Sequence, residues 1–196
     1  MQLTAPMIAK MMGEREALVE TQDYLTKRMQ ADAQANSRGA ENERLQLSIQ
    51  NAITKATGTA LANVLNFDLD SNGNPITSNV SKDEAAQIQD TASLTSSLVK
   101  KYYDKTHDIA KVQEVASRIA TNFQRVDMNY ILPWKTDSGI FILPKQLHGK
   151  TLNLDRLQNE LEKLPDDQAK QLMEAKSALW RRQAIDEQIQ ALGLQR

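Results

Sequence analysis

The sequence of 196 residues has no cysteine, only seven glycines and five prolines, and an aromatic content of 5%. The absence of cysteine excludes a disulfide framework, a thiolate nucleophile and a sulfur-ligated metal site. No apolar run reaches the roughly 18 residues of a membrane span, and the N-terminus lacks a basic start followed by an apolar stretch. We therefore expect neither a transmembrane segment nor a cleaved secretory signal, and the scarcity of glycine and proline favours long helices.

The charges are balanced and mixed along the chain. Lysine and arginine number 24 and the acidic residues 25, which gives a net charge of −1. Because the basic residues are interspersed with acidic ones, the sequence offers no surface that would follow a phosphate backbone. We therefore expect no nucleic-acid partner.

The longest candidate element covers residues 81–126, which contain neither proline nor glycine. A capping box, Ser81 with Glu84, marks its start. Apolar residues recur at heptad spacing for most of its length, and the pattern weakens at Thr91, Thr95 and Lys105. The positions that define this seam are Ile88, Leu98, Tyr102, Ile109, Val112, Ile119, Phe123 and Val126. We predict one long coiled-coil helix. It is either a member of an ordinary helix bundle or a rod whose assembly seam is completed by helices of the same or of another subunit.

The N-terminal segment, residues 1–66, is predicted to form a helical hairpin. Its first helix, over residues 5–35, carries a methionine-rich stripe, which is either core or a partner-binding face. The cluster Asn36-Ser37-Arg38-Gly39 is loop-like, so we expect a turn there and a second helix to residue 66. An unbroken helix through Gly39 is the alternative, because one glycine costs only about 1 kcal/mol relative to alanine.

A loop at residues 67–80 contains the one motif with specific chemistry. Asp68, Asp70 and Asn72 stand at the alternating positions of a calcium-binding loop, followed by Gly73. The twelfth position holds Asn79 instead of the usual bidentate glutamate. We therefore predict an Asx turn and keep these residues only as a weak calcium candidate.

The remaining chain is predicted to contain a small mixed insert, residues 127–165, and a C-terminal helix within residues 166–196. Bulky segments at 127–134 and 140–143 flank a polar loop and indicate a β-hairpin, followed by a short helix. The expected fold class is mainly α, an elongated helical hairpin and coiled-coil bundle with a small α/β insert.

No arrangement of residues for catalysis is found. His107 and His148 lack the motifs of metal or nucleophilic sites, and Asp166 with Asp167 suits a helix N-terminus. We predict no catalytic residue, no cofactor, no metal and no enzymatic activity.

The order of these segments resembles the hydrophilic translocators of bacterial type III secretion, the needle-tip and tip-filament proteins. That resemblance compares residues 81–126 and 166–192 with a coiled-coil pair and residues 127–165 with the insert between them. The stretch from Lys150 to Leu161, KTLNLDRLQNEL, is similar in style to a segment of some tip proteins. The final helix is shorter than its expected partner and no apolar C-terminal tail follows it.

The resemblance implies a self-assembling virulence protein that is secreted without a cleaved signal, lies at the bacterial surface, and contacts copies of itself and other secretion-apparatus proteins. The resemblance assigns no functional role to any single residue of this chain. The alternative is a structural component of a bacteriophage virion or ejection apparatus, since such proteins are also helical and rich in glutamine and alanine.

Overall fold

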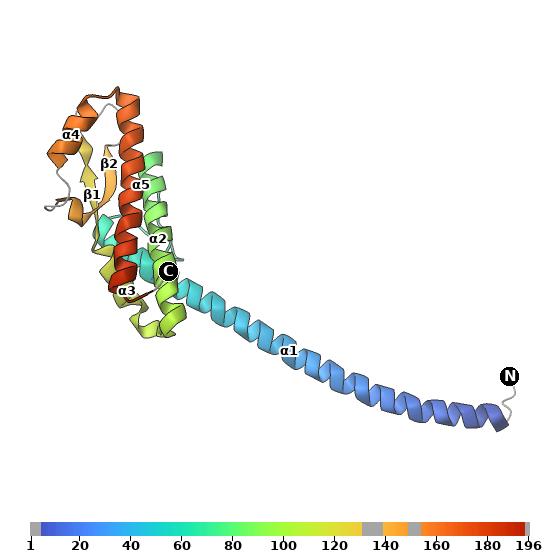
Figure 1. Cartoon of the computed structure of the whole chain (residues 1–196). Coiled ribbons are helices and arrows are strands. Elements are labelled where there is room, and N and C mark those ends of the chain that lie inside the picture. The colour runs from blue at the N-terminus through green and yellow to red at the C-terminus, as the bar shows by residue number, and fades with distance from the viewer. Residues whose placement is uncertain (1–4, 131–138, 149–153, 195–196) are drawn as a thin grey trace. The chain divides into compact units, whose positions relative to one another are not determined.

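The computed structural model describes residues 5–130, 139–148 and 154–194, and it is mainly helical with a small two-stranded sheet. The predicted fold class, mainly α with a β-hairpin insert, is confirmed. The chain divides into two units, Met1–Ser48 and Ile49–Arg196. Figure 1 colours these units from blue at the N-terminus to red at the C-terminus.

Helix α1 covers Ala5–Leu65, 61 residues without interruption. The predicted turn at Asn36–Gly39 and the resulting hairpin are therefore wrong, and the alternative of a continuous helix is correct. A Cβ atom on Gly39 would meet nothing within 4 Å, so this glycine serves no close packing or turn. Its cost of about 1 kcal/mol is too small to stop the helix, because alanine, glutamine and glutamate on both sides of the Asn36–Gly39 cluster favour helical structure.

Helix α2 covers Lys82–Thr106, and the predicted continuous helix to Val126 is wrong. Its start is as predicted, because the Ser81 side chain accepts the Glu84 amide hydrogen at 3.1 Å. It ends at Thr106. The next residue, His107, caps it with a positive φ of 53° and donates its amide hydrogen to the Tyr103 carbonyl. The 3-10 helix η1 (Ile109–Lys111) and helix α3 (Val112–Ala120) follow.

The physical reason for the break lies in α3. Its residues Val112, Val115 and Ile119 are buried, and α3 packs against α2. A straight helix would keep successive turns apart along its axis, so these side chains could not reach the core that α2 lines. Burying each of them stabilises the folded chain by about 1.5–3 kcal/mol, more than one non-glycine residue in the left-handed region costs.

The sheet pairs β1 (Phe123–Asp127) with β2 (Ile140–Pro144) in antiparallel register, with Phe123 opposite Pro144. The first strand therefore begins four residues earlier than the predicted segment at 127. The 3-10 helix η2 (Met128–Tyr130) follows β1, and residues 131–134 of the predicted strand lie outside the described residues. Pro144 is the last residue of its strand, where its missing amide hydrogen does no harm.

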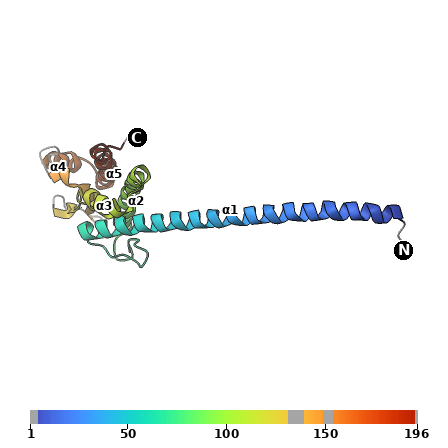
Figure 2. The same cartoon turned by 90° about the horizontal axis from the view of Figure 1, so that it is seen from below.

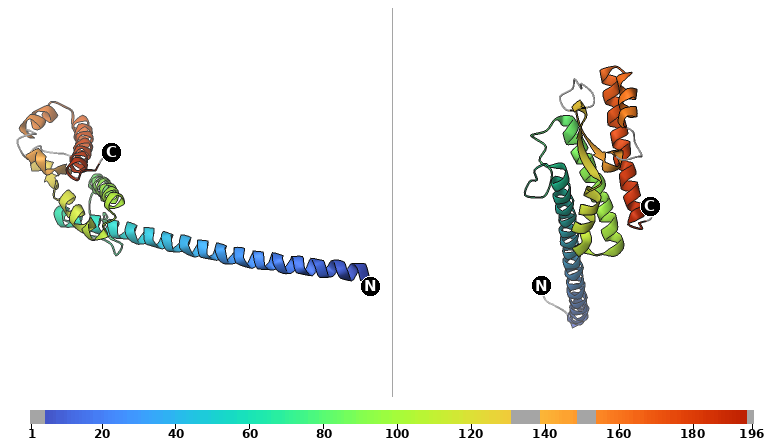
Figure 3. Two further views of the ribbon diagram at one scale, coloured as in Figure 1. Left: turned by 60° about the horizontal axis from the view of Figure 1, so that its bottom comes forward. Right: turned by 90° about the vertical axis from the view of Figure 1, so that its left-hand side faces the viewer.

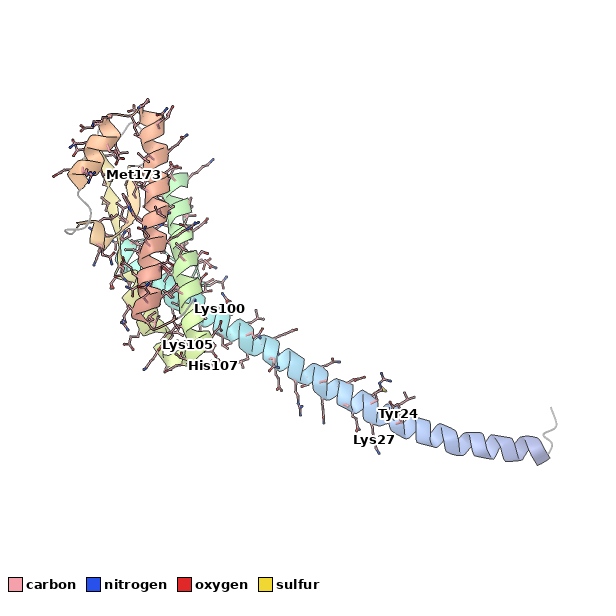
Figure 4. The ribbon with its side chains drawn as sticks, in the orientation of Figure 1. Tyr24, Lys27, Lys100, Lys105, His107 and Met173 are labelled. Carbon is pink, nitrogen blue, oxygen red and sulfur yellow. The ribbon has the colours of Figure 1, made fainter. Side chains whose placement is uncertain are left out.

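The two faces of the sheet belong to two hydrophobic cores, as the alternation of strand side chains requires. The main core includes Ile53, Leu61, Leu65, Ile88, Leu98, Val112, Ile119, Phe123, Ile142 and Ile185. The second core includes Val126, Met128, Phe141, Leu143, Leu147, Leu157, Leu161, Met173 and Trp180. Met173, labelled in Figure 4, is fully buried on α5 in the second core.

The last elements are the 3-10 helix η3 (Lys145–His148), α4 (Leu154–Glu162) and α5 (Asp166–Ala191). Helices α2 and α5 lie side by side in Figures 1 and 2. The Asp83–Lys170 pair at 2.7 Å lies near their starts, and a hydrogen bond from Lys105 Nζ to the Gly193 carbonyl, 2.6 Å, lies near their ends. The two helices therefore run parallel. Helix α2 has 25 residues and α5 has 26. The two helices are nearly equal in length because α2 ends at Thr106 and not at Val126.

Candidate functional site

The outer edge of β2 is closed by side chains instead of a third strand. Gln87 of α2 donates from Nε2 to the Ile140 carbonyl, 3.1 Å, and accepts the Ile142 amide hydrogen on Oε1, 2.8 Å. These two bonds occupy the backbone groups that a neighbouring strand would pair. Gln87 is buried, so the bonds satisfy polar groups that water does not reach. The right-hand view of Figure 3 shows α2 beside the strands.

Arg181 of α5 extends this closure with a buried charge. Its guanidinium donates to Ser177 Oγ at 2.6 Å, to the Ile142 carbonyl at 3.3 Å and to Asp90 Oδ2 at 3.0 Å. Burial lowers the pKa of Arg181, while the hydrogen bond with Asp90 and its negative charge raise it. Arginine stays protonated under such conditions, so a paired cation holds α2, β2 and α5 together.

Arg125 of β1 joins three elements of the unit Ile49–Arg196. Its Nη1 donates to the carbonyls of Leu65, 3.1 Å, and Asn66, 3.3 Å, at the end of α1. Its Nη2 forms an ion pair with Glu84 in the first turn of α2, a residue only 3% exposed. The last carbonyls of a helix carry partial negative charge, so a cation is favourable there. The arrangement ties α1, α2 and the sheet.

These residues were not among the predicted sites, and their signal in the sequence is weak. Arg125 lies between Phe123 and Val126 in a short apolar segment. A charged side chain that is buried there needs an acidic group or a hydrogen-bond acceptor beside it. The partners themselves, Leu65 and Glu84, are 60 and 41 residues away. Gln87 gives no comparable signal, because glutamine is common on solvated helix faces.

The calcium-like loop forms the predicted Asx turn. Asp70 Oδ1 accepts the amide hydrogens of Asn72 and Asn74, both at 2.9 Å, and the Gly73 amide donates to the Asp70 carbonyl. The Ile76 amide donates to the Asp68 carbonyl at 2.8 Å. Within the described residues, no group of three or more His, Cys, Asp or Glu residues is placed to hold a metal ion.

The same loop packs closely on α1 through two glycines. A Cβ on Gly58 would lie 2.1 Å from the Gly73 carbonyl oxygen, and a Cβ on Gly73 would lie 2.9 Å from Lys55 Cα. Gly73 also has a positive φ of 86°. The glycine that the motif places at the sharp turn is therefore needed both for backbone conformation and for the approach to α1.

The predicted assembly seam is largely covered within the chain. Ile88, Leu98, Val112, Ile119 and Phe123 lie in the main core, and Val126 lies in the second core. Tyr102 packs partly against the main core, whereas Ile109 is 48% exposed at the bend after His107. The seam is thus divided among α2, η1, α3 and β1. The interpretation of these residues as one continuous surface is wrong, because the chain folds back after Thr106.

The exposed part of α1 presents the largest contrast with these buried sites. Every side chain from residue 24 to residue 48 is exposed. Large apolar side chains among them include Tyr24, 62% exposed, Met29, 70% exposed, and Leu25. Figure 4 labels Tyr24 and Lys27, whose side chains project from the ribbon of α1. Leu45 and Leu47 are also exposed, nearer the folded unit in sequence.

The described helices include none with the length and apolar character needed to cross a membrane. His107, the one histidine whose side chain is described, is exposed and stacks on Tyr103 with ring centroids 5.8 Å apart.

No protein-family model, curated protein or solved structure matches the chain.

Proposed function

We propose that this chain is a non-enzymatic assembly protein and that the N-terminal part of α1 is its associating element. The observation that carries the proposal is the complete exposure of residues 24–48 inside a helix of 61 residues. Its exposed large apolar side chains form two groups, one of Tyr24, Leu25 and Met29 and one of Leu45 and Leu47. A contiguous exposed apolar group on a helix is a candidate association site. The buried polar side chains Gln87 and Arg181 hold helices against the sheet, which is a structural role.

The physics of isolated helices supports an external partner. Most helical stability in proteins comes from packing one face, and an unpacked helix in water is marginal. Leu25 and Met29 are four residues apart and therefore share a face. In the sequence, Met11 and Leu18 precede Leu25 at seven-residue intervals, which is the spacing of a coiled-coil seam. The spacing ends after Met29, because Asp32 and Asn36 follow, so the face that other helices, including those of neighbouring copies, would cover is centred on Leu25 and Met29.

The finer proposal is a needle-tip or tip-filament protein of type III secretion, acting at the bacterial surface as a homo-oligomer. The matched helices α2 and α5, with a mixed α/β segment between them in the sequence, support this class. Antibody labelling of intact bacteria that carry the native secretion system tests it. Labelling that depends on an active apparatus is expected, whereas detection only in purified phage particles would favour the bacteriophage alternative.

Association is tested by sedimentation of the full chain over a wide range of concentration. The wild-type protein is expected to form oligomers as its concentration rises. The double variant Leu25→Glu, Met29→Glu should need more than about tenfold higher concentration, because two apolar side chains worth about 1.5–3 kcal/mol each lose their burial.

The matched control is Gln30→Glu with Gln34→Glu, two exposed positions with the same spacing on the same helix. It adds the same charge without removing an apolar side chain, so it should associate like the wild type. A wild-type chain that stays monomeric at every concentration would contradict the proposal, as would a control that dissociates as far as the double variant.

A further inference from the structure

We draw no further inference here: the strongest candidate, the surface patch formed by Tyr24, Leu25 and Met29 on α1, belongs to the assembly surface already proposed, and nothing in the structure shows which partner covers it.

Discussion

Residues 24–48 and the described residues between 49 and 194 are both rich in helix, yet they differ in what stabilises that helix. In the second region, α2 buries Ile88, Leu98 and Val99 against other elements of the same chain. In the first region, every side chain is exposed. Helical pattern and helical stability are therefore separate properties of this sequence. The second region obtains its stability from its own core, and the first depends on local propensity or on association.

The largest expected difference between the two regions comes from removing an aromatic ring. Phe123 is fully buried and Tyr24 is 62% exposed. Phe123→Ala should lower the free energy of unfolding by about 3–5 kcal/mol through lost burial and a cavity. Tyr24→Ala should change it by no more than about 0.5 kcal/mol. Urea unfolding of both variants at a low protein concentration measures this contrast, and equal losses would contradict the assignment of the core.

The next effect concerns the closed edge of β2. Gln87→Ala would leave the Ile140 carbonyl and the Ile142 amide without their partners. We expect a loss of about 2–4 kcal/mol, since each buried unpaired group costs about 1–3 kcal/mol. Gln89→Ala, an exposed position on the same helix, is the control and should be nearly neutral. Amide exchange at Ile142 that is equally slow in both variants would refute the proposed role of Gln87.

Two glycines should respond to alanine with opposite signs. Gly73→Ala should destabilise the protein by about 1–2 kcal/mol, because of its positive φ and the short approach to Lys55. Gly39→Ala should strengthen the exposed part of α1 by about 0.5–1 kcal/mol, because it lies in open helix. Circular dichroism during thermal unfolding reports both changes. A destabilising effect at Gly39 would mean that this position has a packing role.

The smallest effect is electrostatic and lies between α4 and α5. Lys176 Nζ lies 2.8 Å from Glu160 Oε2, and the hydrogen bond and charge of Lys176 lower the pKa of Glu160 below its ordinary value. Because the pKa of Glu160 is lower in the folded state than in the unfolded chain, the pair stabilises the fold at pH values above the unfolded-state pKa. This stabilisation is lost as the pH falls through the folded-state pKa. Lys176→Gln should raise the pKa of Glu160 in an NMR titration. An unchanged titration midpoint would show that Lys176 and Glu160 do not interact in solution.

Local chemistry made parts of this structure predictable from the sequence. Ser81 caps α2 through a residue three positions away, and Asp70 forms its turn through amides two and four positions away. The mainly α fold and the small hairpin followed from periodicity and from turn residues. Each of these features depends on neighbours in the sequence, where spacing determines which groups meet.

Long-range packing set the features that the sequence did not reveal. The heptad phase continues through His107, so periodicity alone favoured one helix to Val126. The chain turns there because α3 and β1 reach the same core as α2, a gain that no local pattern records. The roles of Gln87 and Arg125 depend on partners 41 to 60 residues away. The same limit applies to residues 24–48, whose partner lies outside the chain in our proposal.

The most direct test of that proposal is amide hydrogen exchange of the full chain at several protein concentrations. Opening free energies differ between regions, and association protects only the amides that it covers. We predict that protection of residues 24–48 rises with concentration while that of β1 and β2 stays constant, and that Leu25→Glu with Met29→Glu abolishes the rise. Protection of residues 24–48 that is independent of concentration would contradict the account.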